Sequence, residues 1–256
     1  MVCSSATSLI VPYIQCRLHM KVALDINFIY NIITKTMALS NKKILEEMKN
    51  GNIVIEPFNQ EHLNTSSYDV SLGEYYFREQ RSPDYLGIYN IYNKKHTDLV
   101  WGKKPEKAKR AKELIGDPNA IGLNPETKII LLDPGETILA HTNEFIGGKN
   151  IITTMMKARS SLGRNFIEVC KCAGWGDVGY TNRWTMEITN NSRRYTIPLA
   201  VGKRVAQIIF FHTGEISGKD YTKSGKYQRK TSLKELQREW RPETMLPKLY
   251  KDFEKK

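Results

Sequence analysis

Three segments in the second half of the chain combine residue types that suit a phosphorylated ligand carrying a ring. The first, Arg159-Ser160-Ser161-Leu162-Gly163-Arg164, places two guanidinium groups and two hydroxyls within six residues. Arginine supplies forked, charged donors to phosphate oxygens, and serine adds hydroxyl and backbone N–H donors. Because Arg/Ser/Gly loops are also common as solvated turns, this segment alone is a weak indication of a polyphosphate site.

The second segment is glycine-rich and reads Ala173-Gly174-Trp175-Gly176-Asp177-Val178-Gly179-Tyr180. A tight turn of this composition can enclose a flat base or a sugar. Asp177 can accept a hydrogen bond from a sugar hydroxyl, and Tyr180 offers a ring face. A hairpin capped by Asp177 accounts for the same residues, so composition alone leaves both interpretations open.

The third segment, Trp184-Thr185-Met186-Glu187-Ile188-Thr189, has the pattern of a strand. Because successive side chains of a strand point to opposite faces, Thr185 and Glu187 share the more polar face. Most glutamates on strands simply face solvent. A catalytic role requires Glu187 to line a pocket with Arg164, where burial would raise the glutamate pKa and the guanidinium would lower it.

The composition is that of a globular protein whose surface attracts phosphate groups. Its 256 residues, 40% of them hydrophobic, are enough to bury a full core. The 39 Lys and Arg against 27 Asp and Glu give a net charge of +12, which favours nucleic acid or free nucleotides as partners. The four cysteines form no CxxC pair, which indicates a reducing compartment. No apolar stretch reaches the roughly 18 residues that cross a bilayer, so a cytoplasmic protein without membrane contact is expected.

Strand signals dominate the chain after its first helix. Turn residues such as Asp133-Pro134-Gly135 and Gly147-Gly148 separate the strands. Cys170 and Cys172 fall on alternate positions of a further expected strand, where we interpret them as packing residues. Many short strands with such turns predict an all-β sandwich or barrel. The main predicted strands are residues 53–56, 68–72, 128–132, 137–141, 151–156, 184–189 and 204–211.

Three helices are predicted around these strands. Ser40 can cap a helix that Gly51 terminates. Residues 105–115 begin with proline, precede a glycine and carry many basic side chains, which predicts a surface helix with a solvated face rather than a nucleic-acid site. A capping box at residues 232–235 predicts a C-terminal helix that continues up to Pro242.

The three segments, in this order and spacing, resemble the signature of the dCTP deaminase family, part of the trimeric dUTPase superfamily. The resemblance extends from Met37 to Gln228, and its strongest stretch includes Arg164 and Glu187, which are 23 positions apart. Weaker similarities are Ser67-Tyr68-Asp69-Val70-Ser71-Leu72-Gly73, Gly202-Lys203-Arg204-Val205-Ala206-Gln207, and Tyr221 with Gly225-Lys226-Tyr227-Gln228.

The resemblance implies an all-β fold, a distorted jelly-roll barrel of dUTPase type with a few peripheral helices. It also implies a homotrimer whose active sites are shared between neighbouring subunits, with no requirement for nucleic acid. Residues 37–231 would form the catalytic domain, with 78–127 as an insertion. Residues 1–36 would be a loosely ordered extension, and 232–256 a helical tail.

Site residues are carried over from the family position by position. Glu187 matches the catalytic glutamate, and Arg164 matches an arginine that supports its carboxylate and the water. Ser160 matches a serine that orders the site, and Ala173 a small residue that leaves room for the water. Asp177 matches the residue that reads the deoxyribose. The expected nucleotide-binding residues are Arg159, Ser160, Ser161, Arg164, Asp177, Tyr180, Thr185, Gln207, Tyr221 and Lys226.

The implied reaction is hydrolytic deamination of dCTP to dUTP and ammonia. Zinc-dependent deaminases carry an H-x-E and a P-C-x-x-C pattern. Here no histidine is followed two residues on by glutamate, and CxxC is absent. We therefore expect Glu187 to work without zinc, assign no metal ligand, and expect Mg²⁺ to enter only with the triphosphate.

Asp177 leaves dUTP hydrolysis open as a second activity, because dUTP-hydrolysing relatives use an aspartate there to orient water. Ala173-Gly174-Trp175 resembles bifunctional members that convert dCTP to dUMP, although a basic side chain found there in some relatives is missing. Lys230 stands where the family often has a nucleotide-binding glutamine. A non-catalytic nucleotide or nucleic-acid binding protein is the less favoured alternative, because a pure binder has no need of Glu187 in its pocket.

Overall fold

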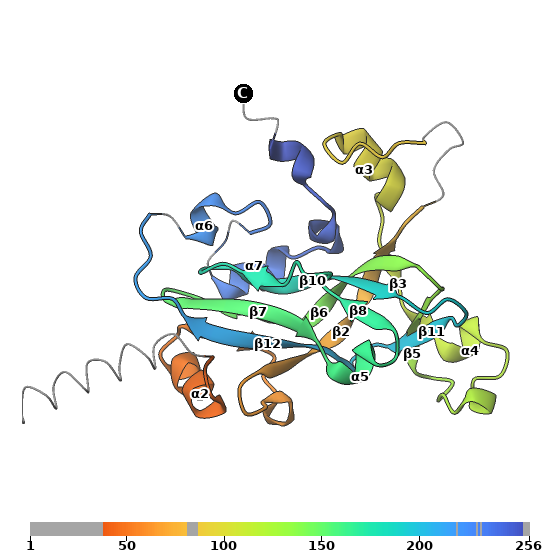
Figure 1. Cartoon of the computed structure of the whole chain (residues 1–256), viewed down its shortest axis with the longest axis horizontal. Coiled ribbons are helices and arrows are strands. Elements are labelled where there is room, and N and C mark those ends of the chain that lie inside the picture. The colour runs from red at the N-terminus through yellow and green to blue at the C-terminus, as the bar shows by residue number, and fades with distance from the viewer. Residues whose placement is uncertain (1–37, 81–86, 219, 229, 231, 253–256) are drawn as a thin grey trace, which may run out of the picture.

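The computed structural model describes residues 38–80, 87–218, 220–228, 230 and 232–252, so the predicted extension 1–36 lies outside the described residues. Figure 1 shows a long, curled antiparallel sheet with short helices at its edges. The prediction of an all-β fold with a few peripheral helices is therefore confirmed.

One large sheet carries the candidate site. Its strands are β1 (Ile53–Glu56), β2 (Tyr68–Arg78), β3 (Glu106–Lys107), β6 (Thr137–Gly148), β7 (Ile152–Ala158), β8 (Ile167–Val169), β9 (Trp175–Gly176), β10 (Thr181–Asn190) and β12 (Arg204–His212). Within the described residues the order is β8-β10-β6-β2-β12-β7-β9, with β1 beside β6 and β3 beside β2. A small second sheet has the order β11-β5-β4. Its strands are β4 (Lys109–Arg110), β5 (Lys128–Leu132) and β11 (Ile197–Ala200).

Short helices and turns surround the sheets. The first, α2, forms as predicted, because the Ser40 hydroxyl accepts a hydrogen bond from Lys43 N at 3.3 Å and Gly51 follows its end at φ 78°. The C-terminal helix begins after Ser232 as predicted, but it ends at Glu239. The helices and 3-10 turns are α2 (Asn41–Lys49), η1 (Gln60–His62), α3 (Lys94–Trp101), α4 (Ala111–Leu114), η2 (Asn119–Ile121), α5 (Ser160–Gly163), α6 (Tyr221–Ser224), α7 (Leu233–Glu239), η3 (Pro242–Met245) and η4 (Leu249–Asp252).

The seven main predicted strands are all present, but β6 is much longer than its pattern indicated. The prediction that Gly147-Gly148 separates two strands was wrong, because both glycines lie inside β6. They are needed for close packing of backbones. A Cβ at Gly147 would lie 1.9 Å from the Tyr180 carbonyl oxygen, and one at Gly148 would lie 2.3 Å from that of Ile152.

The predicted surface helix at residues 105–115 was also wrong in its first half. Glu106–Lys107 pairs with β2, and Lys109–Arg110 pairs with β5, so only Ala111–Leu114 is helical. Pairing with strands distant in sequence here overrides the local helix signals. Salt bridges such as Lys107–Glu74 and Arg110–Glu113 partly neutralise the basic run.

Two clusters of buried side chains lie on opposite faces of β6 and β2. The main core takes the inner face, as shown by Ile138 and Ala140 of β6 with Met186 and Ile188 of β10. A second core, consisting of Phe77, Leu139 and Met245, covers part of the outer face. None of the helices in the described residues is long and apolar enough to cross a membrane.

Candidate active site

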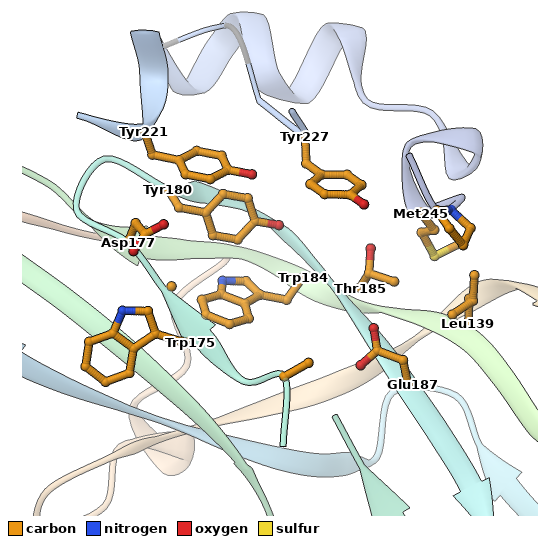
Figure 2. Close-up of a pocket in the computed structure, with 13 residues that line it drawn as sticks. Leu139, Trp175, Asp177, Tyr180, Trp184, Thr185, Glu187, Tyr221, Tyr227 and Met245 are labelled. Atoms are coloured by element: carbon orange, nitrogen blue, oxygen red, sulfur yellow. The ribbon is translucent and has the colours of Figure 1, made fainter. Parts of the chain in front are cut away.

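A pocket of about 370 Å³ opens on the outer face of β10, between the glycine-rich turn and the C-terminal segments. Its size lies in the range of small-molecule sites. Figure 2 shows three tyrosines above Glu187 and Thr185, with Asp177 at one end and Met245 at the other. The lining residues are Leu139, Ala173, Trp175, Gly176, Asp177, Tyr180, Trp184, Thr185, Glu187, Tyr221, Tyr227, Met245 and Pro247.

Alternation along β10 directs Thr185 and Glu187 into this pocket, as the strand pattern predicts. Met186 and Ile188 are fully buried in the main core and fix the opposite face. Trp184 holds the strand in register, since its indole Nε1 donates to Ile146 O at 2.9 Å and its backbone N donates to the Thr142 hydroxyl at 2.9 Å. The position of the candidate catalytic side chain therefore follows from core packing.

Glu187 is half-buried, and its chemistry depends on that burial. Burial raises the pKa of the Glu187 carboxyl above its ordinary value, and the nearby positive charge of Lys171 lowers it in part. A carboxyl with a raised pKa is suited to accept and return a proton near neutral pH. Burial therefore raises the Glu187 pKa within one chain, as predicted. The positive charge that lowers this pKa comes from Lys171 rather than from Arg164.

A tight turn before the glycine-rich segment presents Ala173 to the pocket. Cys170, Lys171 and Cys172 all have left-handed backbone conformations, with φ of 68°, 34° and 68°. The backbone N of Ala173 donates to Cys170 O, and Cys170 N donates to Glu187 O at 2.9 Å. The prediction that Cys170 and Cys172 lie on a strand was therefore wrong, since β8 ends at Val169. Cys170 is buried as a packing residue, whereas Cys172 is exposed.

Aromatic side chains build the end of the pocket next to Asp177. The ring of Tyr180 makes edge contacts with Trp184 at 5.2 Å and with Tyr221 at 5.1 Å between centroids. Burial raises the pKa of the Tyr180, Tyr221 and Tyr227 phenols, so all three are neutral near pH 7. Neutral phenols can donate hydrogen bonds to a ligand. Asp177 stands at the exposed rim beside them.

The segment after α6 is tied to the glycine-rich turn through Gln228. Its side-chain oxygen accepts from Thr181 N at 2.7 Å, and its Nε2 donates to Gly179 O at 3.0 Å. This anchor places Tyr227 in the pocket wall. Lys226 does not line the pocket, and its ammonium forms an ion pair with Asp252 near the C-terminus.

The basic loop lies apart from this pocket within one chain. Of the residues 159–164, none lines the pocket, and Figure 1 places α5 well away from α6 and α7. Arg159 Nε instead lies 3.2 Å from the buried Asp69 carboxylate, which also binds Arg204 at 3.2 Å. Gln207 is opposite Asp69 and Lys157 in the sheet, again outside the pocket. Within one copy of the chain, Arg164 therefore does not reach Glu187. The sequence analysis required these two residues to line the same pocket.

Among the predicted site residues, the pocket joins Ala173, Asp177, Tyr180, Thr185, Glu187 and Tyr221. Sequence reasoning missed Tyr227, although it stands inside a quoted motif, and it missed the pocket role of Trp184. It also missed Leu139, Met245 and Pro247. Met245 and Pro247 had no recognisable signal, because they enter the pocket only through the packing of the C-terminal tail, whereas Leu139 enters from β6 as the register partner of Glu187.

Comparison with known proteins identifies the family of this chain. A family model described as dCTP deaminase-like matches residues 38–213. A relative from Leptospira biflexa serovar Patoc, named "dCTP deaminase, dUMP-forming", is 36% identical over 224 residues, covering 86% of this chain and 100% of the relative. A relative of the same name from Hydrogenobaculum sp. is 32% identical over 182 residues, covering 70% of this chain and 85% of the relative.

A solved structure of 2'-deoxycytidine 5'-triphosphate deaminase from Agrobacterium tumefaciens is also similar, with a TM-score of 0.44 and 16% identity. The match covers 69% of this chain and 48% of that structure. The family assignment rests on the sequence relatives and the family model, which span most of the chain. The chain belongs to the dCTP deaminase-like family.

Proposed function

We propose that this protein deaminates dCTP and then hydrolyses the resulting dUTP to dUMP and pyrophosphate in the same pocket. The observation that carries the proposal is a half-buried carboxylate, Glu187, facing a pocket whose rim holds a second one, Asp177. The relatives named "dCTP deaminase, dUMP-forming" support the two-step form over simple release of dUTP. The expectation of dUTP as the final product is replaced by this two-step proposal.

In the first step, Glu187 acts as general base and then as general acid. It takes a proton from water while the water oxygen bonds to C4 of cytosine, and it passes that proton to N3. It then moves the proton of the new C4 hydroxyl to the exocyclic nitrogen. The C4–N bond breaks, ammonia leaves, and C4 becomes the carbonyl carbon of uracil. Ala173, a small residue on the pocket wall, leaves space for the water.

In the second step, Asp177 orients a water molecule toward the α-phosphorus of dUTP. The water oxygen bonds to the α-phosphorus and its proton is released to solvent, while the bond from the α-phosphorus to the bridging oxygen breaks and pyrophosphate leaves. The placement of Asp177 next to Tyr221 supports this role, because the phenol can hold the sugar or phosphate end of the nucleotide. Asp177 also offers an acceptor to the deoxyribose hydroxyl during the first step.

The pocket of one chain lacks the positive charge that a triphosphate requires. None of the described residues lining it is lysine or arginine, although Glu187 and Asp177 both carry negative charge when ionised. Arg159 and Arg164 flank α5, remote from the pocket of their own chain. We therefore place them in the pocket of a neighbouring subunit of a homotrimer, together with Ser160 and Ser161.

Magnesium would be held mainly by the nucleotide itself. The described residues contain no group of three or more His, Cys, Asp or Glu side chains placed to bind a metal ion. Mg²⁺ is commonly bound through substrate phosphates with few protein carboxylates. When bound, Mg²⁺ would neutralise triphosphate charge, while the proton transfers to N3 and to the exocyclic nitrogen remain with Glu187.

The pH dependence of deamination tests the role of Glu187. Because the general base must be ionised and burial raises its pKa, kcat/KM for dCTP is expected to fall below an apparent pKa higher than the ordinary value of 4.5. Lys171→Ala removes the positive charge that lowers this pKa, so the acid limb should move to higher pH. Rates of ammonia release measured between pH 4 and 9 check both shifts. An acid limb at or below 4.5 would contradict the assignment.

The two-step proposal is tested by Asp177→Asn. Asparagine keeps a hydrogen-bond acceptor for the sugar but loses the charge that orients the second water. Wild-type protein with dCTP and Mg²⁺ is expected to yield dUMP, whereas the variant should still release ammonia but accumulate dUTP. Resolving the nucleotides by anion-exchange chromatography checks this. Unchanged dUMP formation by the variant would refute the role of Asp177.

A further inference from the structure

The pocket has an apolar wall beside Glu187 that the proposed proton transfers do not use. Leu139 of β6 is the register partner of Glu187 on β10, and it lines the pocket together with Met245 and Pro247. Figure 2 shows Leu139 and Met245 on the side of Glu187 and Thr185, with Asp177 and Trp175 at the far end. The apolar wall is therefore next to the reacting end of any bound base.

The second core fixes this wall in place. Met245 is 3% exposed and Leu139 4% exposed, and both pack with Phe77. Trp101 from the insertion and Leu246 from the C-terminal tail pack against the same cluster. Because interiors are close-packed, Met245 has a defined position relative to Leu139, unlike a side chain on a loose tail.

A separate contact anchors the tail that carries Met245. The Trp240 ring contacts the His141 ring at 4.7 Å between centroids, and the Arg183 guanidinium lies over the Trp240 ring, 4.8 Å from its centroid. Burial lowers the pKa of His141 to about 4, so its ring is neutral at the pH of most assays and contacts Trp240 without charge repulsion from Arg183. Met245 follows this anchor closely in sequence and is thereby held against the outer face of the sheet.

The orientation of the base assigns a role to this wall. In the proposed reaction, C4 of the pyrimidine lies at Glu187, and the sugar extends toward Asp177. C4 is flanked by N3, which receives a proton, and by C5, which carries only hydrogen. Thr185 and the apolar residues Leu139 and Met245 line the same part of the pocket. Because N3 needs a polar partner and C5 does not, the chemistry of the two edges favours Thr185 beside N3 and the apolar wall beside C5.

We infer that Met245, backed by Leu139, is a specificity-determining residue that restricts the group at C5 of the pyrimidine. In this orientation of the base, the Met245 side chain would limit the space left for a 5-methyl substituent. The inference rests on the proposed function, because the base orientation follows from deamination at Glu187. It concerns a residue of the C-terminal tail that the proton-transfer steps leave unassigned.

The test compares dCTP with 5-methyl-dCTP as substrates of wild type, Met245→Ala and the control Leu246→Ala. A methyl group in an apolar pocket changes kcat/KM by about 10- to 200-fold, so Met245→Ala should raise the ratio of 5-methyl-dCTP to dCTP activity by at least about 10-fold. Leu246 packs on the second core but does not line the pocket, so its variant should keep the wild-type ratio. Both substrates are assayed in one preparation, so partial unfolding cancels from the ratio.

The remaining outcomes are distinguishable. An unchanged ratio in Met245→Ala, with dCTP still turned over, would overturn the inference while leaving the proposed function intact. If Met245→Ala is inactive on both substrates, Met245→Val is assayed, and the same increase in ratio is required of it. Inactivity of both variants would also overturn the inference, because Met245 would then only support the fold. Wild type that releases no ammonia from dCTP would instead refute the proposed function.

Discussion

Glu187→Gln is expected to lower kcat for ammonia release from dCTP by about 10²- to 10⁴-fold, the usual contribution of general acid–base catalysis. Glutamine fills the same space in the pocket but can neither accept the proton of water nor return it. Binding of dCTP should remain close to that of wild type, because the pocket keeps its shape. Ammonia release and calorimetric titration with dCTP measure the two quantities separately.

Glu168→Gln is the matched control. It makes the same chemical change on β8, which pairs with β10, but Glu168 does not line the pocket. Its activity should match that of wild type.

Glu187→Gln should not lower the unfolding temperature at pH 8. Because burial raises the pKa of Glu187 in the folded protein, ionisation costs stability as pH rises through that pKa, and a neutral side chain removes this cost. Ammonia release by Glu187→Gln at the wild-type rate would exclude Glu187 as the acid/base residue.

Mixed trimers of Glu187→Gln and Arg164→Ala are expected to regain activity that neither variant has alone. Each variant disables every site of its own homotrimer, because each site would combine Glu187 of one subunit with Arg164 of a neighbour. Any mixed ring contains one junction where both residues are intact. Random assembly of equal amounts should therefore restore about a quarter of wild-type activity, and mixed trimers isolated from the homotrimers should show about a third.

This experiment measures ammonia release after co-expression of differently tagged variants and isolation of the mixed species. A control mixture of Glu187→Gln with Ala173→Arg, both located in the same pocket, should stay inactive, because no junction then contains an intact site. If the first mixture is as inactive as its components, the arginine and the glutamate do not come from different subunits.

Many of the strands were predictable because their signals are local. The predicted bounds of residues 53–56 and 128–132 match β1 and β5, where apolar runs lie between clear turns. Alternation along residues 184–189 also predicted correctly that Thr185 and Glu187 share one face, because the apolar residues that alternate with them are buried.

Errors arose where distant segments decide local structure. The glycine pair at the end of β6 reads as a turn, but it lies in a strand because the backbone of Tyr180 passes directly over Gly147. The helix-like run at 105–115 is divided by two strand pairings. Met245 could not be assigned to the pocket from sequence, because its position depends on how Trp240 packs on His141 and Arg183.

The predicted site residues also fall into two groups, those that one chain brings together and those that it keeps apart. The motif residues that lie close together in sequence, Ala173, Asp177 and Glu187, meet in one pocket. Arg164 belongs to the same sequence signature, yet strand β8 and the turn after it separate it from Glu187. The sequence signature thus groups Arg164 with Glu187, whereas one chain keeps them apart, and this separation is the basis for proposing that a neighbouring subunit supplies the arginine.

The products that the wild-type protein forms from dCTP test the central claim most directly. Purified protein is incubated with dCTP and Mg²⁺, and ammonia, pyrophosphate, dUTP and dUMP are quantified in the same samples. We expect ammonia, dUMP and pyrophosphate in equal amounts. Ammonia with dUTP alone would contradict hydrolysis as the second step, and the absence of ammonia would contradict both proposed steps.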